Sequence, residues 1–178
     1  MALPSTIYNV SVELNDVDRN VYESLVLRLA LHPSETMEYL VTRLLAYCLE
    51  YTDGIEMTAG LSDGEEPAIV VRDLTGRLTG WIEVGLPQAE RLHRASKRVD
   101  HVAVYAHRDS RILLGQLEGQ KIHRASDLAI YSFGGSFIGD VAERFGRRVQ
   151  MSVSITEQHI YLDINGHSLS TTITRHSI

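Results

Sequence analysis

The chain has little of several things that specialised proteins require. Cys48 is the single cysteine in 178 residues, so the chain can form neither an internal disulfide nor a cysteine-based zinc site. Its four prolines exclude a proline-rich or fibrous chain. No apolar run approaches the roughly 20 residues that cross a bilayer, and the first residues lack the basic and apolar regions of a signal peptide. We therefore expect a cytoplasmic protein without a membrane partner.

Positive charge is also scarce. The sequence has 17 lysines and arginines against 23 acidic residues, a formal net charge of −6, and its only lysines are Lys97 and Lys121. This balance excludes a broad positive surface that coats nucleic acid, so any contact with nucleic acid is expected to be local. The length, with 44% hydrophobic residues, predicts one domain over residues 1–178 with a single core.

The first quarter of the sequence predicts a hairpin and a helix. Apolar residues alternate over residues 6–15 and again over 21–31, with a turn-rich segment between them, as in two half-buried strands. Pro33 is suited to the first position of a helix, which is then predicted to run to about Tyr51.

The following segments predict an αβββαβ core over about residues 34–107. Short strands are expected at 55–61, 67–73 and 78–85, then a helix at 88–99 and a strand at 101–105. The last two of the three strands are joined around Thr75-Gly76, which predicts an antiparallel pair. Helical segments near 110–118 and 136–145, a strand at 127–133 and a closing antiparallel meander complete an α+β fold with a mixed sheet. Asn165-Gly166 is the clearest hairpin turn in the sequence.

One motif matches a serine hydrolase only by its letters. Gly60-Leu61-Ser62-Asp63-Gly64 has the spacing of a nucleophile elbow, which requires a strand before the serine and a helix after it. Glu65-Glu66-Pro67 follows instead, so we interpret the segment as an acidic turn.

Two carboxylates at the start of the first predicted helix have different expected environments. On a helical wheel, the apolar stripe from Met37 to Cys48 predicts that Glu38 borders the core. Glu35 is sufficiently explained by the favourable interaction between an acid and a helix N-terminus. If Glu38 is shielded from water, it needs a partner, which can be a metal ion, an arginine or solvent.

Glu83 is the most conspicuous acid, because it lies inside an otherwise apolar strand. In the predicted antiparallel pair, residues near Glu66 lie opposite those near Glu83, whereas Asp73 lies at the turn end. Glu66, Glu83 and Glu38 are therefore predicted to converge. Three carboxylates suit Mg²⁺ or Mn²⁺ and phosphodiester hydrolysis, although surface acids or structural ion pairs also fit the spacing.

The only dense basic run, residues 91–98, follows the Glu83 strand. Such a run usually forms the solvated face of a helix. Arg94 and Lys97 are neighbours at positions i and i+3, so they can present a small phosphate-binding patch.

Segments spread over the whole chain carry a family resemblance. The most specific are His32-Pro33-Ser34-Glu35-Thr36 and Trp81-Ile82-Glu83-Val84-Gly85-Leu86-Pro87, in that order. With them the sequence resembles the YaeQ family of small bacterial proteins. The resemblance implies a divergent PD-(D/E)XK nuclease-like fold, whose αβββαβ core agrees with the order predicted above.

The resemblance also implies roles for particular residues. In that superfamily the site combines an acid from the first helix, an acid on the second core strand and an acid-x-lysine motif on the third. By position these are Glu38, with Glu35 as second choice, Glu66 and Glu83. Gly85 occupies the place of the lysine, so a basic group from the next helix, Lys97 or Arg94, is the available replacement.

Two functions stay open at this point. One is a Mg²⁺- or Mn²⁺-dependent phosphodiesterase or nuclease that uses these acids. The other is a non-catalytic module with a nuclease-like fold that binds nucleic acid or a protein partner, and the acidic net charge favours a protein over DNA.

Overall fold

The computed structural model describes residues 3–59 and 65–178, and the chain divides into two compact units. The first unit consists of residues 1–44 and 133–174, and the second of residues 45–132 and 175–178. Within each unit, strands pair in both parallel and antiparallel directions. The fold is therefore α+β, as the sequence predicts.

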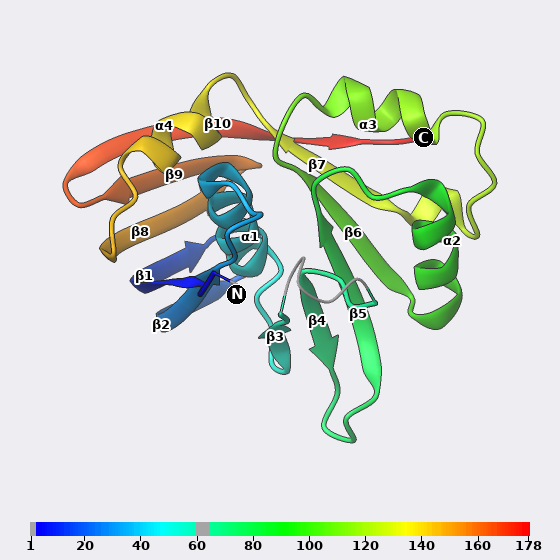
Figure 1. The fold of residues 1–178 in the computed structure, drawn as a ribbon, viewed down its shortest axis with the longest axis horizontal. Coiled ribbons are helices and arrows are strands. Elements are labelled where there is room, and N and C mark those ends of the chain that lie inside the picture. The colour runs from blue at the N-terminus through cyan, green and yellow to red at the C-terminus, as the bar shows by residue number, and fades with distance from the viewer. Residues whose placement is uncertain (1–2, 60–64) are drawn as a thin grey trace. The chain divides into compact units, whose positions relative to one another are not determined.

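The sheet of the first unit joins the N-terminal hairpin to the C-terminal meander. Its strands lie in the order β2 (Val21–Leu31), β1 (Thr6–Asp16), β8 (Arg148–Thr156), β9 (His159–Ile164) and β10 (His167–His176) (Figure 1). The β1–β8 pair is parallel and the other pairs are antiparallel. The hairpin and the meander are both confirmed, but their parallel pairing was not predicted. Asn165 and Gly166 both have positive φ angles, 49° and 87°, as a tight hairpin turn requires.

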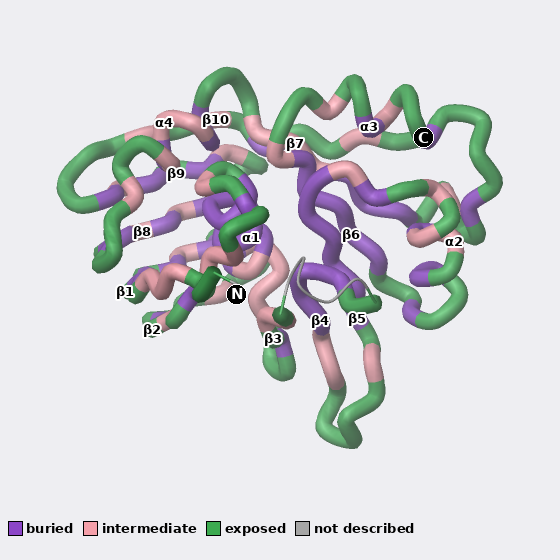
Figure 2. Tube along the Cα trace, viewed as in Figure 1, coloured by how far each residue is buried: buried purple, intermediate pink, exposed green. Residues whose placement is uncertain are grey.

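Alternation along these strands separates a buried face from a polar one. Val10, Val12 and Leu14 on β1 are each 1% exposed, whereas Ser11 and Glu13 between them are exposed. The same alternation follows β8 in Figure 2. Successive side chains of a strand point to opposite faces, so the apolar residues collect on one side of the sheet.

The sheet of the second unit follows the predicted core order. Its strands lie in the order β7 (Ala129–Phe133), β6 (His101–Ala106), β5 (Leu78–Val84), β4 (Ile69–Arg72) and β3 (Ile55–Met57). The pairs among β3, β4 and β5 are antiparallel, and those among β5, β6 and β7 are parallel. Asp73 closes the β4–β5 turn, where its carboxylate accepts a hydrogen bond from Arg77 N at 3.0 Å. The predicted antiparallel pair around Thr75-Gly76 is thus confirmed.

Helices α2 (Ala89–Arg98) and α3 (Ser110–Leu117) cover one face of this second sheet (Figure 1). Leu92 and Ala95 of α2 are 0% and 1% exposed, and they pack with Trp81 and Val104 of the sheet. A short 3₁₀ turn (Ala125–Asp127) precedes β7. Helix α4 (Phe137–Glu143) belongs to the first unit. Among the described residues, no helix is both long and apolar enough to cross a membrane.

Helix α1 (Met37–Leu49) begins later than predicted. Instead of a first helical turn at Pro33, the chain forms a separate turn in which Glu35 N donates to His32 O at 2.9 Å. Thr36 then caps the helix, because its Oγ1 accepts a hydrogen bond from Tyr39 N at 3.1 Å. With this start, the order α1-β3-β4-β5-α2-β6 is the αβββαβ order predicted for residues 34–107.

Candidate functional site

Glu83 on β5 is buried, with 6% of the residue exposed, and its carboxylate is already engaged. Its Oε1 accepts a hydrogen bond from the indole Nε1 of Trp81 at 2.8 Å and a second from Nε of Arg91. The sequence prediction that a carboxylate in this strand needs a partner is met by an arginine from α2. A buried carboxylate paired with an arginine in this way needs no metal ion to balance its charge.

Arg91 connects three parts of the second unit. Besides Glu83, its Nη2 donates to the backbone oxygen of Glu66 at 2.7 Å, just before β4. Its guanidinium also lies 5.7 Å from the ring centroid of Trp81, and that of Arg98 lies 5.4 Å from the same ring. Arg91 therefore bridges the backbone oxygen of Glu66 and the carboxylate of Glu83. Glu66 as a whole residue is exposed to solvent.

The acids of the first helix have the reverse of their expected environments. Glu38 is exposed, whereas Glu35 is only 8% exposed. The prediction that Glu38 borders the core is wrong, because Glu38 lies in the exposed first turn of α1, whereas residues 39–46 are buried on every side of the helix. Burial lowers the pKa of Arg43 on the same helix, and the nearby charge of Glu35 acts in the opposite direction.

A metal site made by Glu38, Glu66 and Glu83 stays a prediction. In residues 3–59 and 65–178, no group of three or more His, Cys, Asp or Glu side chains is arranged to hold a metal ion. At Glu83 itself, Oε1 carries two hydrogen-bond donors, so a cation there has to compete with Arg91. The Gly60–Gly64 motif lies outside the described residues.

The C-terminal end of α2 forms one wall of a basic pocket of about 290 Å³. We call it the α2 pocket. Four cations and one carboxylate line it, together with His123 and residues of β5 and α2. The charged lining residues are Arg77, Lys97, Arg98, Arg124 and Asp100.

The charges of this pocket are unevenly compensated. Arg124 pairs with Asp100 at 2.7 Å and with Asp127 at 3.1 Å, and the hydrogen bond from Arg124 lowers the pKa of Asp100. Within the described part of the chain, Arg77 and Lys97 form no ion pair within 4.0 Å. The pocket therefore retains a net positive charge inside a protein that is acidic overall.

The titration of a neighbouring histidine responds to this positive charge. Burial lowers the pKa of His93, and the charges of Lys97, His123 and Lys121 lower it further. Nδ1 of His93 accepts a hydrogen bond from the backbone N of His123 at 3.0 Å, which fixes the unprotonated nitrogen. His93 thus links α2 to His123, which lines the pocket.

The structure separates the two basic candidates that the sequence could not distinguish. Lys97 lines the α2 pocket, whereas Arg94 is exposed on the same helix and is not among the lining residues. Sequence reasoning missed Arg77 and Arg124, which enter the pocket from a turn and a loop far from α2 in sequence. It also missed Arg91 as the partner of Glu83, although Arg91 begins the basic run.

Together these features define an α+β protein that has a buried ion pair between Glu83 and Arg91 and a basic pocket at the C-terminal end of α2. A family model described as YaeQ protein matches residues 1–173. The YaeQ proteins of Salmonella typhi and Escherichia coli (strain K12) are 30% identical to this chain over 175 and 176 residues, with 98% of this chain and 97% of each relative covered. The chain therefore belongs to the YaeQ family, which confirms the resemblance noted in the sequence.

Two solved structures agree with this assignment. The crystal structure of YaeQ protein from Pseudomonas syringae is similar with a TM-score of 0.89 and 31% identity, covering 99% of this chain and 98% of that one. The structure of YaeQ protein from Xanthomonas axonopodis pv. citri has a TM-score of 0.82 and 25% identity, with 97% and 98% covered. The whole fold of this chain is thus shared with these relatives.

Proposed function

We propose that this protein is a non-catalytic module that binds nucleic acid in the cytoplasm by holding backbone phosphate in the α2 pocket. The observation that carries the proposal is that Arg91 occupies the Glu83 carboxylate, while Lys97 and Arg77 face a pocket with surplus positive charge. Lysine and arginine donors suit phosphate oxygens. Binding through one pocket is also the local contact that a net charge of −6 allows.

The proposal includes the fold relationship that the YaeQ resemblance implies. Residues 34–107 are taken as a PD-(D/E)XK-like core in which Gly85 replaces the strand lysine. The antiparallel β3–β4–β5 ladder followed by the parallel β5–β6 pair supports this interpretation. Without that lysine, and with Glu83 paired to Arg91, the core has kept a place to bind phosphate and has lost the means to cut.

Binding is tested by fluorescence anisotropy with labelled single- and double-stranded DNA and RNA. Removing one charged donor to a phosphate costs about 1.5 kcal/mol or more, so Lys97→Ala and Arg77→Ala are each expected to weaken binding roughly tenfold. Arg94→Ala is the matched control, since it removes the same charge from the same helix outside the pocket. If Arg94→Ala weakens binding as much as Lys97→Ala, the charge acts through the surface as a whole and the pocket assignment is wrong.

A second candidate is Mg²⁺- or Mn²⁺-dependent phosphodiester cleavage. The observation in its favour is that Arg91 ties the backbone of Glu66 to the buried Glu83. In this alternative Glu38, Glu66 and Glu83 hold the ion, which acidifies a water, and Lys97 or Arg94 stabilises charge on the phosphate. It requires Arg91 to leave Glu83 before the ion binds.

A further inference from the structure

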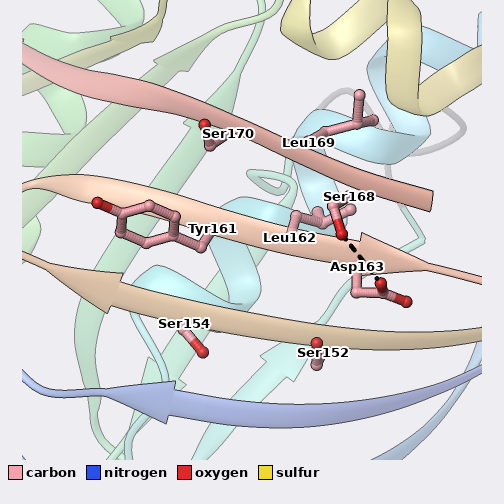
Figure 3. Close-up of a pocket in the computed structure, with 8 residues that line it drawn as sticks. All are labelled: Ser152, Ser154, Tyr161, Leu162, Asp163, Ser168, Leu169 and Ser170. Carbon is pink, nitrogen blue, oxygen red and sulfur yellow. Dashed lines mark hydrogen bonds between the residues drawn. The ribbon is translucent and has the colours of Figure 1, made fainter. Parts of the chain in front are cut away.

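A second open pocket lies in the first unit, on the face of the sheet formed by β8, β9 and β10 (Figure 3). We call it the sheet pocket. Its volume is about 300 Å³, at the lower end of the range for small-molecule sites. Two leucines and six polar residues line it. The polar residues are Ser152, Ser154, Tyr161, Asp163, Ser168 and Ser170.

Tyr161 on β9, the middle of the three strands, supplies an aromatic surface to the pocket. It is 54% exposed, and the strand register places Ser154 and Ser170 opposite it on either side. Directly opposed residues share one face of a sheet, so the ring stands between two hydroxyls. The ring centroid of His159 lies 4.7 Å from that of Tyr161. His159 Nδ1 in turn lies 3.3 Å from Thr172 Oγ1, so His159 is positioned beside the tyrosine ring by a hydrogen bond.

Asp163 forms the second polar centre, one pleat further along β9. Its Oδ1 accepts a hydrogen bond from Gly166 N at 3.1 Å, and its Oδ2 accepts one from Ser168 Oγ at 3.3 Å (Figure 3). Ser152 lies opposite it on β8. An ionised carboxylate has about four acceptor positions, so an oriented Asp163 can accept further hydrogen bonds from a ligand.

The charge of the sheet pocket differs from that of the α2 pocket. Asp163 is the only acidic residue among the eight lining residues, and none of the eight is a lysine, arginine or histidine. The lining therefore offers no cationic side chain to bind a phosphate or nucleotide. The pocket instead offers hydroxyls that both donate and accept, one acceptor carboxylate and one aromatic face.

We propose that the sheet pocket binds a neutral saccharide. The C–H face of a sugar ring packs on Tyr161, and sugar hydroxyls donate to Asp163 and exchange hydrogen bonds with the flanking serines. A sugar carries hydroxyl groups around an apolar ring face, so it matches both features of the lining without requiring a countercharge. This site is independent of the proposed phosphate binding, since its residues all belong to the first unit.

The test is an NMR titration of the ¹⁵N-labelled full chain with N-acetylglucosamine and with cellobiose. Saturable amide shifts are expected at the residues of the sheet pocket. Tyr161→Ala and Asp163→Asn are each expected to weaken binding roughly tenfold, since each removes an interaction of about 1–2 kcal/mol, whereas Tyr161→Phe keeps the ring and most of the affinity. Tyr22→Ala is the matched control, because Tyr22 is 55% exposed on the same unit but does not line the pocket.

Three results would overturn the proposal. The first is that neither sugar produces saturable shifts at these residues in the millimolar range. The second is that Tyr22→Ala weakens sugar binding as much as Tyr161→Ala does. The third is that spermidine binds instead and loses its affinity in Asp163→Asn, which would assign a cation site. Preserved dispersion in the spectra of the variants checks that each one is folded.

Discussion

Arg91 donates its Nε hydrogen to the same Glu83 oxygen that accepts the indole N–H of Trp81. The side chain of Glu83 is 8% exposed and that of Arg91 25%, so the carboxylate is nearly withdrawn from water while the guanidinium keeps some access to it. The acid that the sequence presents as a metal ligand is therefore also part of the contact between α2 and β5.

Removing Arg91 is expected to destabilise the protein more than altering Glu83. Arg91→Ala leaves a buried carboxylate without its countercharge, at a cost of about 3 kcal/mol. Glu83→Gln keeps an acceptor for Trp81 and leaves a partly exposed arginine, at a cost of about 1–2 kcal/mol. Urea unfolding measures both, with Arg94→Ala as the control for loss of charge from α2. An Arg91→Ala protein as stable as Arg94→Ala would show that the pair contributes nothing.

Gly54 and Gly76 have almost the same φ angle but different space around them, so substituting each one distinguishes the cost of backbone strain from the cost of a steric clash. Gly76 has φ 84° with open space around a built Cβ, so Gly76→Ala is expected to cost about 1 kcal/mol. Gly54 has φ 85°, and a Cβ there would lie 1.9 Å from the carbonyl oxygen of Arg72. Gly54→Ala is expected to cost about 1–3 kcal/mol more than Gly76→Ala. Equal unfolding free energies for the two variants would contradict the close approach of β3 to β4.

The pair of His101 and Glu50 predicts a pH dependence of stability. The hydrogen bond between His101 Nε2 and Glu50 Oε2, 2.7 Å long, raises the pKa of His101 above its ordinary value of 6.5. Because the folded state binds this proton more tightly, the stabilisation is complete below the unfolded pKa and is lost as pH rises through the raised one. The effect is modest, since the His101 side chain is 49% exposed.

The measurement is the urea unfolding midpoint of wild type and of His101→Gln across the pH range in which His101 titrates. The midpoint of wild type is expected to exceed that of the variant most at acidic pH, and this difference is expected to shrink from about pH 6.5 upward. A difference that grows with pH would mean that Glu50 does not stabilise the protonated ring.

Ligand binding in the α2 pocket is expected to raise the pKa of His93. Burial and the charges of Lys97, His123 and Lys121 hold this pKa low, and a bound phosphate offsets the positive charges. The imidazole C–H resonances of His93, followed by NMR against pH, give the pKa of His93 in the free protein and in the protein with a bound oligonucleotide. Lys97→Ala is expected to raise the pKa of His93 in the free protein as well. An oligonucleotide that binds but leaves the His93 titration unchanged would place its phosphates elsewhere.

Local signals in the sequence predicted most of the elements, because they depend on neighbouring residues. Alternation identified β1 and β2, and the Asn165-Gly166 dipeptide identified the β9–β10 turn. The predicted environments of Glu35 and Glu38 were wrong, because the sequence does not show that α1 starts only at Met37 or that residues 39–46 are buried on every side. The α2 pocket depends on Arg77 and Arg124 reaching one helix from distant segments, which no spacing rule in the sequence indicates.

Nucleic-acid binding without cleavage is tested most directly by measuring binding and the length of the DNA or RNA in one experiment. Labelled DNA and RNA are incubated with wild type, Glu83→Gln and Lys97→Ala, in Mn²⁺ and in EDTA. Wild type and Glu83→Gln are expected to bind equally in both conditions, Lys97→Ala is expected to bind roughly tenfold more weakly, and all of the labelled DNA and RNA is expected to stay intact. Cleavage by wild type in Mn²⁺ that is absent in EDTA and abolished in Glu83→Gln would contradict this expectation and establish the metal-dependent alternative.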